Sequence, residues 1–260
     1  MEPQPVSAYA LELAWRTDKG RIRQRNEDSV AVDQDRGLLV VADGVGGATA
    51  GHVASRLVVE TILERFRRRK TARLDGDKAR LYLEAAVEEA NIAIWRHAKE
   101  HPEFAGMGST VVVGAVGWEW LAVAHVGDSR VYRLRGEHFE QLTHDHSFIQ
   151  EVVDQGFFSS REDAKRYGIG DNILTRALGS MPSVGVASDL FEIEPGDLIL
   201  LCSDGLTGMV PEDWLRQILI AVQDNTLDSA ADALIRLANE RGGVDNITLA
   251  MARIGDRLAD

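Results

Sequence analysis

The residues in this sequence that are best suited to chemistry are acidic side chains at the ends of apolar segments. Two short apolar runs, residues 38–42 and 198–202, each stop at an Asp-Gly pair. Runs of this length and character are typical of buried strands, so each pair is expected at a strand end beside the core. The two pairs are Asp43-Gly44 and Asp204-Gly205, and the other acidic residues that adjoin predicted strands are Glu27, Asp28, Asp128 and Asp245.

Several carboxylates held near one another at strand ends predict a site for multivalent cations. A buried carboxylate without a basic partner is costly, and a cation offsets that cost. Oxygen ligands suit Mg²⁺ or Mn²⁺, and the sequence offers no Cys/His set for zinc. A glycine after the aspartate permits a sharp turn and lets the backbone carbonyl approach an ion. Each Asp-Gly pair alone is more often a simple turn, so the prediction depends on the whole set.

The elements that must position these residues come in runs of strands and runs of helices, which predicts an α+β fold with packed sheets and outer helices. Residues 111–142 are expected to form one antiparallel meander, and residues 143–183 an inserted flap segment over a site. No linker composition is present, so residues 1–260 are expected to form a single domain. Strands are predicted at residues 9–16, 28–33, 38–42, 111–116, 120–126, 130–134, 138–142, 185–193, 198–202 and 246–254, and helices at residues 53–69, 78–99, 211–222 and 228–241.

The composition limits the partners and the compartment. The net charge of -12 and the pI of about 5.1 oppose broad attraction to nucleic acid or to an anionic membrane. The single cysteine, Cys202, lies in an apolar run and cannot form a disulfide framework, which fits a reducing compartment. Residues 1–10 lack the features of a signal peptide, and no window approaches the roughly 18 apolar residues of a membrane span. We therefore expect a cytoplasmic protein with no nucleic-acid or membrane partner.

Seven short motifs follow one another along the chain, and their order and spacing carry more information than any one of them. They are Arg23-x-x-Asn26-Glu27-Asp28, Asp43-Gly44-Val45-Gly46-Gly47, Gly108-Ser109-Thr110, Gly127-Asp128-Ser129-Arg130, Leu174-Thr175-Arg176-Ala177-Leu178-Gly179, Ser203-Asp204-Gly205-Leu206 and Asp245-Asn246-Ile247-Thr248. This series resembles that of the metal-dependent protein phosphatases of type 2C. The resemblance spans residues 9–254, and the short chain is similar to the bacterial branch of the family.

The resemblance implies a four-layer α-β-β-α sandwich, in which two packed antiparallel sheets are flanked by helix pairs. It also implies two Mn²⁺ or Mg²⁺ ions bridged by Asp43, with the Gly44 carbonyl at one ion. Asp204 and Asp245 would bind the other ion. The remaining positions matched to metals or their waters are Glu27, Asp28 and, for a third and weaker ion, Asp128 together with Asp204.

The implied activity is hydrolysis of phosphoserine and phosphothreonine on proteins, opposing a bacterial serine/threonine kinase of the eukaryotic-like kind. Two ions lower the pKa of a water between them from about 15.7 towards neutrality, and the resulting hydroxide attacks phosphorus. Arg23 matches the arginine that grips the phosphate, a task for which a planar guanidinium suits better than lysine. The expected catalytic residues are Arg23, Asp43, Asp204 and Asp245.

The sequence departs from the family at the proton donor to the leaving group. Some members carry a histidine directly after the first Asp-Gly and many bacterial ones carry it after Gly-Gly, whereas here these positions are Val45 and Ala48. His52 could substitute, although a histidine near a helix start is more often a surface or capping residue. A metal-bound water is the preferred acid. His144 and His146 could suggest a further metal site, but a structural role is favoured.

Two alternatives remain open at this point: a phosphatase of anti-sigma-factor antagonists, and a non-catalytic pseudophosphatase that serves as a scaffold. The Arg23 motif and the motif at residues 127–130 favour the leading interpretation. Retention of Asp43, Asp204 and Asp245 argues against a scaffold, because loss of one would cripple a two-metal site. The expected partners are phosphorylated proteins, including a serine/threonine kinase, and the protein is expected to be a monomer.

Overall fold

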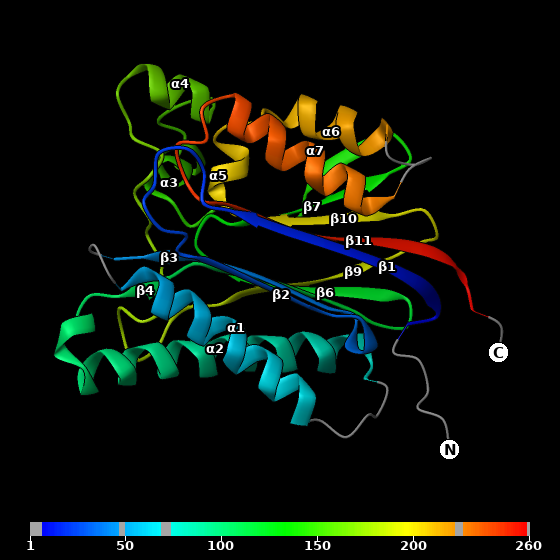
Figure 1. Cartoon of the computed structure of the whole chain (residues 1–260), viewed down its shortest axis with the longest axis horizontal. Coiled ribbons are helices and arrows are strands. Elements are labelled where there is room, and N and C mark those ends of the chain that lie inside the picture. Colours follow the sequence, from blue (N-terminus) through cyan, green and yellow to red (C-terminus); the bar gives the residue numbers. More distant parts are fainter. Residues whose placement is uncertain (1–6, 47–49, 69–73, 222–225, 259–260) are drawn as a thin grey trace.

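Two antiparallel sheets lie face to face between two groups of helices (Figure 1). The computed structural model describes residues 7–46, 50–68, 74–221 and 226–258. Helices α1 (Gly51–Arg68) and α2 (Gly76–Glu100) cover one sheet, and α6 (Glu212–Ala221) and α7 (Leu227–Glu240) cover the other. The predicted α-β-β-α order is confirmed. Among the described residues, no helix combines the length and the apolar character that a membrane span requires.

The first sheet has the strand order β1-β11-β10-β7-β8, and the second has the order β2-β3-β5-β6-β9 with β4 paired to β3. All of the pairings are antiparallel. The strands are β1 (Tyr9–Asp18), β2 (Asp28–Asp33), β3 (Leu38–Val45), β4 (Gly108–Ser109), β5 (Val111–Val116), β6 (Trp120–Val126), β7 (Arg130–Arg135), β8 (His138–Gln141), β9 (Ala187–Glu192), β10 (Leu198–Cys202) and β11 (Ile247–Arg257).

The two solid apolar runs are central strands covered on both faces. In β3, Leu38 and Val40 pack towards the helices, whereas Leu39 packs between the sheets. In β10, Leu200 and Leu201 divide in the same way between the helix side and the other sheet. Successive side chains of a strand point to opposite faces, so a strand with two covered faces has no polar alternation. This explains why both runs are continuously apolar.

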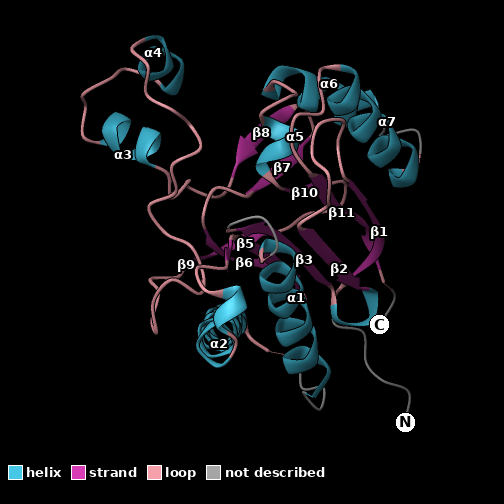
Figure 2. Ribbon diagram, turned by 60° about the vertical axis from the view of Figure 1, so that its left-hand side comes forward, coloured by secondary structure: helices cyan, strands magenta, loops and turns pink. Residues whose placement is uncertain are grey.

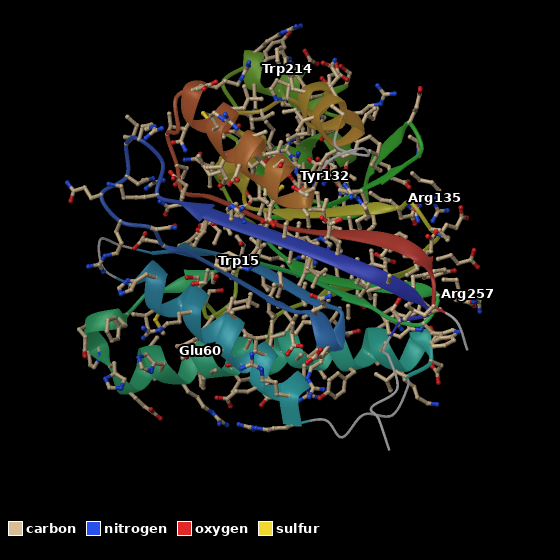
Figure 3. All side chains as sticks on the ribbon, turned by 45° about the vertical axis from the view of Figure 1, so that its right-hand side comes forward. Trp15, Glu60, Tyr132, Arg135, Trp214 and Arg257 are labelled. Atoms are coloured by element: carbon tan, nitrogen blue, oxygen red, sulfur yellow. The ribbon has the colours of Figure 1, made fainter. Side chains whose placement is uncertain are left out.

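The side chains fill the space between the layers (Figure 3). Tyr132 of β7 is fully buried in the layer beneath α6 and α7, where it packs with residues such as Leu215 and Leu234. A third cluster lies between the two sheets and includes Leu39 and Leu201. The protein therefore has three hydrophobic layers, one on each side of the sheet pair and one within it.

The predicted single meander over residues 111–142 is wrong. Strands β5 and β6 belong to one sheet and β7 and β8 to the other, so the chain crosses between sheets at residues 127–129. Gly127 has a φ of +104° there, and a Cβ on it would lie 2.7 Å from the Thr110 side chain. A Gly-containing turn signals a change of direction but does not specify which strand the next one pairs with. The crossing places Asp128 between the two sheets.

Most other boundaries agree with the prediction within a few residues, although Arg69 and Val222, the expected ends of two helices, lie outside the described residues. Between residues 143 and 183 lie two short helices, α3 (Phe148–Asp154) and α4 (Arg161–Arg166), which stand apart from the sheets in Figure 2. We call residues 143–183 the flap segment. The remaining elements are α5 (Asp204–Thr207) and the 3₁₀ helices η1 (Gln34–Arg36) and η2 (Pro102–Phe104).

Candidate metal centre

Three of the predicted acidic residues meet where the two central strands end. Asp43 and Asp28 lie directly opposite each other in the β2–β3 pair. From the other sheet, Ser203 donates a hydrogen bond from Oγ to Oδ2 of Asp28 at 2.9 Å. Asp204 follows Ser203 and begins α5. The end of β10 is thus tied to the end of β2, and both sheets deliver aspartates to one place.

The electrostatics show that these carboxyl groups sense one another. Burial raises the pKa of Asp43 well above its ordinary value, and the charges of Asp28, Asp204 and Asp128 raise it further. Burial also raises the pKa of Asp204, with the charge of Asp245 as the next cause. Nearby like charges disfavour the charged form of a carboxylate, so these groups lie near one another. The five aspartates therefore form one acidic cluster drawn from segments far apart in the sequence.

Asp28 and Asp128 carry the clearest shifts in this cluster. Burial, followed by the nearby charge of Asp204, raises the pKa of Asp128 to about 7. Burial raises the pKa of Asp28 to about 7 as well, despite hydrogen bonds from Thr248 and Ser203 that favour the charged form. Without a counter-charge the two groups therefore resist ionisation near neutral pH. This is the behaviour expected of ligands whose negative charge a bound cation would balance.

Two oxygens of the cluster indicate whether a metal ion fits among these residues. Oδ1 of Asp28 and Oδ1 of Asp204 are buried, and neither has a hydrogen-bond partner among the described residues. Buried acceptors are normally satisfied, so these two have room for a partner that the polypeptide does not supply. An all-oxygen donor set of this kind suits Mg²⁺ or Mn²⁺. Within the described ranges, no group of three or more His, Cys, Asp or Glu side chains is arranged to hold a metal ion.

Gly44 and Glu27 lie beside the cluster at the start of α1. The Gly44 N–H donates to the Glu27 carbonyl at 3.2 Å. A Cβ on Gly44 would lie 2.2 Å from the carbonyl oxygen of Gly51, the first residue of α1, and 2.6 Å from that of Glu27. Only glycine allows this close approach of three backbone segments. A Cβ on Gly51 would in turn lie 3.1 Å from Cδ of Glu27, which places the Glu27 carboxyl group at this junction.

Arg23 lies at the edge of the cluster and contacts Asp245. Its Nη2 donates to Oδ2 of Asp245 at 2.7 Å, and 54% of the Arg23 side chain is exposed. Both residues line an open groove of about 850 Å³, together with Asp128 and Asp204. The groove continues between the flap segment and the region of α5 and α6. An arginine with most of its side chain in solvent can reach an anion that enters this groove.

Two polar residues for which the sequence predicts no role hold the cluster in place. Thr110 accepts a hydrogen bond from the Asp43 N–H at 3.1 Å and donates its own N–H to the Asp43 carbonyl at 2.8 Å. The Asn246 side chain accepts from the Glu27 N–H at 2.8 Å and donates to the carbonyls of Lys19 and Arg25. Both residues belong to the quoted motifs, and their position in those motifs was the available signal.

The histidines considered as donors or ligands have hydrogen-bond partners other than the carboxylates of the cluster. The ring nitrogens of His52 lie 3.2 and 3.3 Å from Nη1 of Arg25. His146 accepts from the Gly127 N–H at 3.1 Å and stacks on His125, while His144 pairs with Asp154 at 2.6 Å. The two histidines thus have separate structural partners, in line with the role favoured for them. Val45 closes β3, and Ala48 lies outside the described residues.

Paired sheets that deliver aspartates to one point, beside an open groove with an arginine, are the arrangement expected of a metal-dependent phosphatase. The chain belongs to the protein phosphatase 2C family, whose model matches residues 19–239. It is 39% identical over 244 residues to the serine/threonine phosphatase stp of Listeria innocua, with 93% of this chain and 95% of that protein covered. The resemblance inferred from the ordered motifs is confirmed.

Solved structures agree with this assignment. The serine/threonine phosphatase Stp1 from Staphylococcus aureus superposes with a TM-score of 0.88 at 30% identity, covering 98% of this chain and 99% of that one. The catalytic domain of the serine/threonine protein phosphatase PstP, in complex with two manganese ions, gives a TM-score of 0.82 at 36% identity, with 95% and 99% covered. The expected enzyme class, a protein serine/threonine phosphatase, is confirmed with the family.

Proposed function

We propose that this chain hydrolyses phosphoserine and phosphothreonine on proteins at the acidic cluster. The observation that carries the proposal is the pair of buried, unpartnered oxygens on Asp28 and Asp204 beside Asp43. The described residues supply no hydrogen-bond donor to these two oxygens, whereas divalent cations would bind them. The open groove next to the cluster provides access for a substrate attached to a protein.

The residues proposed to hold the ions are those named from the sequence, and the manganese-bound relative supports the choice of metal. Two bound cations lower the pKa of a water between them and stabilise charge on the phosphoryl oxygens. Asp43 lies centrally, because it is affected by the charges of three other aspartates. This supports its proposed bridging role. The full set is Glu27, Asp28, Asp43, the Gly44 carbonyl, Asp204 and Asp245, with Asp128 and Asp204 for a third ion.

Arg23 is proposed to bind the substrate phosphate. Its guanidinium lies at the groove and has donors beyond the one that contacts Asp245. The family's phosphate-binding arginine matches this position, and the backbone around it is fixed by Asn246 through the Arg25 carbonyl. A fixed, charged fork at the mouth of the site orients the phosphate for attack from one side.

We further propose that residues 1–260 form one domain, that the protein acts as a cytoplasmic monomer, and that its substrates include a serine/threonine kinase. The acidic cluster favours catalysis over the scaffold alternative, since Asp43, Asp204 and Asp245 are all present and interact. The presence of arginine at position 23 and the intact motif at residues 127–130 favour protein substrates of the general serine/threonine type over the anti-sigma-factor antagonist alternative.

Purified protein is expected to release phosphate from p-nitrophenyl phosphate and from a phosphothreonine peptide when Mn²⁺ is added. Excess EDTA is expected to stop both reactions, because the cluster then holds no cation. Continuous absorbance and released-phosphate assays measure the two rates. Turnover that survives complete chelation would rule out the metal mechanism, and metal-bound but inactive protein would support the scaffold alternative.

His52→Ala is expected to retain turnover within about twofold of wild type, since its ring faces Arg25 rather than the acidic cluster. The pH dependence of kcat is the measurement. An acidic limb that does not move would show that His52 donates no proton, whereas a lost limb with turnover reduced by about a hundredfold would identify it as the general acid.

A further inference from the structure

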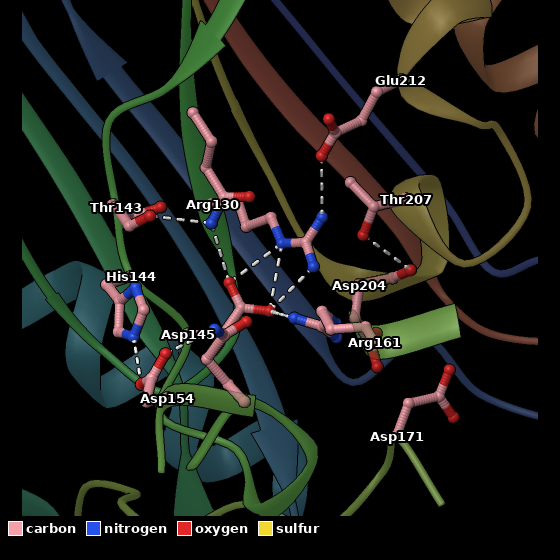
Figure 4. Close-up of polar contacts among 12 residues, drawn as sticks. Arg130, Thr143, His144, Asp145, Asp154, Arg161, Asp171, Asp204, Thr207 and Glu212 are labelled. Atoms are coloured by element: carbon pink, nitrogen blue, oxygen red, sulfur yellow. Dashed lines mark hydrogen bonds and ion pairs between the residues drawn. The ribbon is translucent and has the colours of Figure 1, made fainter. Parts of the chain in front are cut away.

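Three arginines line the groove beside the acidic cluster, and two of them are paired with one buried carboxylate. Arg130 and Arg161 both donate to Oδ2 of Asp145, as Figure 4 shows. Arg23 instead contacts Asp245 and has 54% of its side chain exposed. Because most of this side chain is in solvent, its position depends on the backbone that carries it.

Apolar packing contributes little to the loop of residues 19–25, which carries Arg23. These residues, all of which the structure describes, form no helix or strand, and all of them except Gly20 are exposed. Ile22, the one large apolar side chain of the loop, is 68% exposed. A segment of this kind opens at low free energy unless polar contacts hold it. The polar contacts of the loop therefore decide where Arg23 lies.

Asp18, the last residue of β1, holds the start of this loop. Its Oδ1 accepts hydrogen bonds from the Gly20 N–H at 2.8 Å and from Nδ2 of Asn239 at 3.1 Å. Asn239 is buried near the end of α7, and its Nδ2 also donates to the Ile235 carbonyl of the same helix at 3.2 Å. One carboxylate oxygen thus joins the loop to α7.

The loop also fits closely against the segment that carries Asp245. The Arg21 N–H donates to the Gly243 carbonyl at 2.6 Å, and the Ile22 N–H donates to the same oxygen at 3.3 Å. Gly20 has a φ of +79°, and a Cβ on it would lie 2.1 Å from the Asp245 carbonyl oxygen. Only glycine permits this positive φ together with so close an approach. Release of the start of the loop would therefore shift the loop relative to the acidic cluster.

We propose that Asp18 is a positioning residue for Arg23. Its two hydrogen bonds fix the loop of residues 19–25 to α7 and so hold the guanidinium where it binds the substrate phosphate. This inference rests on the proposed function, because it concerns the phosphate-binding residue of that site. Asp18 is not among the residues proposed to touch the substrate or an ion, and its effect reaches the reaction through Arg23. Because the phosphate is common to all substrates of the site, small and large substrates are expected to respond alike.

The test uses Asp18→Ala, because Asn239 is buried and its truncation would leave a cavity beneath α7. If the variant keeps Arg23 in place about a tenth of the time, the KM for p-nitrophenyl phosphate and that for a phosphothreonine peptide both rise about tenfold. The kcat for each is expected to change less than about twofold, because a saturating phosphate draws the guanidinium back into place. Asp18→Asn keeps a side-chain oxygen of the same shape and is expected to stay within about threefold of wild type.

Two further variants show whether Asp18 acts through Arg23. In Arg23→Ala protein, the added change Asp18→Ala is expected to raise the KM by less than about twofold, since the group that it positions is already gone. The matched control is Glu240→Ala, which removes a carboxylate from an exposed position at the end of α7. This control is expected to resemble wild type on both substrates.

Hydrogen exchange of the Arg21 and Ile22 amides provides a readout independent of activity, because their partner is the Gly243 carbonyl rather than Asp18. Exchange is expected to accelerate in Asp18→Ala and to stay at the wild-type rate in Glu240→Ala. An unchanged KM in Asp18→Ala, or an equal further loss in the Arg23→Ala background, would overturn the inference. Wild-type protein inactive on both substrates would instead refute the proposed function, and the exchange rates would still decide whether Asp18 holds the loop.

Discussion

Asp204→Asn is expected to lower turnover by about a thousandfold or more while the chain stays folded, as is typical when a group that stabilises transition-state charge is lost. The asparagine has the same shape but no charge. Two of the proposed ion sites would therefore lose a charged ligand that they share. Asp204 is buried beside Asp43, and burial with the charge of Asp245 raises its pKa. Removing its charge relieves repulsion in the metal-free protein, so stability is not expected to fall.

The measurements are released phosphate in Mn²⁺ for activity, and thermal unfolding followed by circular dichroism for stability. Asp77→Asn, at an exposed position in the first turn of α2, is the matched control and is expected to resemble wild type in both. A variant at Asp204 that keeps more than about a tenth of wild-type turnover would contradict the proposed metal centre.

Manganese is expected to stabilise the protein strongly, and more so at pH 8 than at pH 6.5. At 100 times its dissociation constant, a ligand that binds only the folded state adds about 2.7 kcal/mol. The pKa of Asp28 and that of Asp128 are about 7 in the folded chain, raised from 3.8 by burial. Because a metal must displace the protons on its ligands, its affinity rises as these groups ionise.

The sign of the pH effect on the metal-free protein follows from the same two groups. Their folded pKa lies above the unfolded value, so their contribution to stability is complete below about pH 4 and is lost as the pH rises through about 7. His146 acts in the opposite sense at lower pH, because burial lowers its pKa to about 3. Most of the histidine contribution is gained below about pH 6.5, so between about pH 6.5 and 8 the aspartates dominate the difference.

Thermal unfolding in EDTA and in Mn²⁺ at the two pH values measures this effect, and subtracting one series from the other cancels groups remote from the metal. Asp28→Asn is expected to flatten the pH dependence of the metal-free protein over this range. A manganese stabilisation that is equal at both pH values and survives Asp204→Asn would show that the ions bind elsewhere.

The features that could be predicted from the sequence are those marked by residues within one short segment of the chain. Asp43 and Asp204 each follow a continuous apolar run, and the runs are continuous because both faces of β3 and β10 are covered. The chain itself therefore marks the strand ends. The ordered motifs then supplied the fold, and the four layers of the structure agree with it.

The parts that could not be predicted depend on pairings between distant segments. The turn at Gly127 has the same composition as a hairpin, yet it leads into the other sheet because β6 pairs with β9 and β7 with β10. The contact between Arg161 and Asp145 joins residues whose letters alone suggest only a polar, mixed region. The support from Thr110 was equally hidden, because a threonine within a motif carries no indication of its partner.

The hydrogen bond from Ser203 to Asp28 joins one sheet to the other at the end of the sandwich that carries the acidic cluster. The spacing between the aspartates that the two sheets contribute is therefore set by the thickness of the apolar layer that contains Leu39 and Leu201. A substitution that changes the thickness of this layer is therefore expected to alter the proposed metal site, although none of the residues of the layer belongs to that site. The proposed cation affinity and the architecture of the sandwich would thus depend on the same layer of side chains.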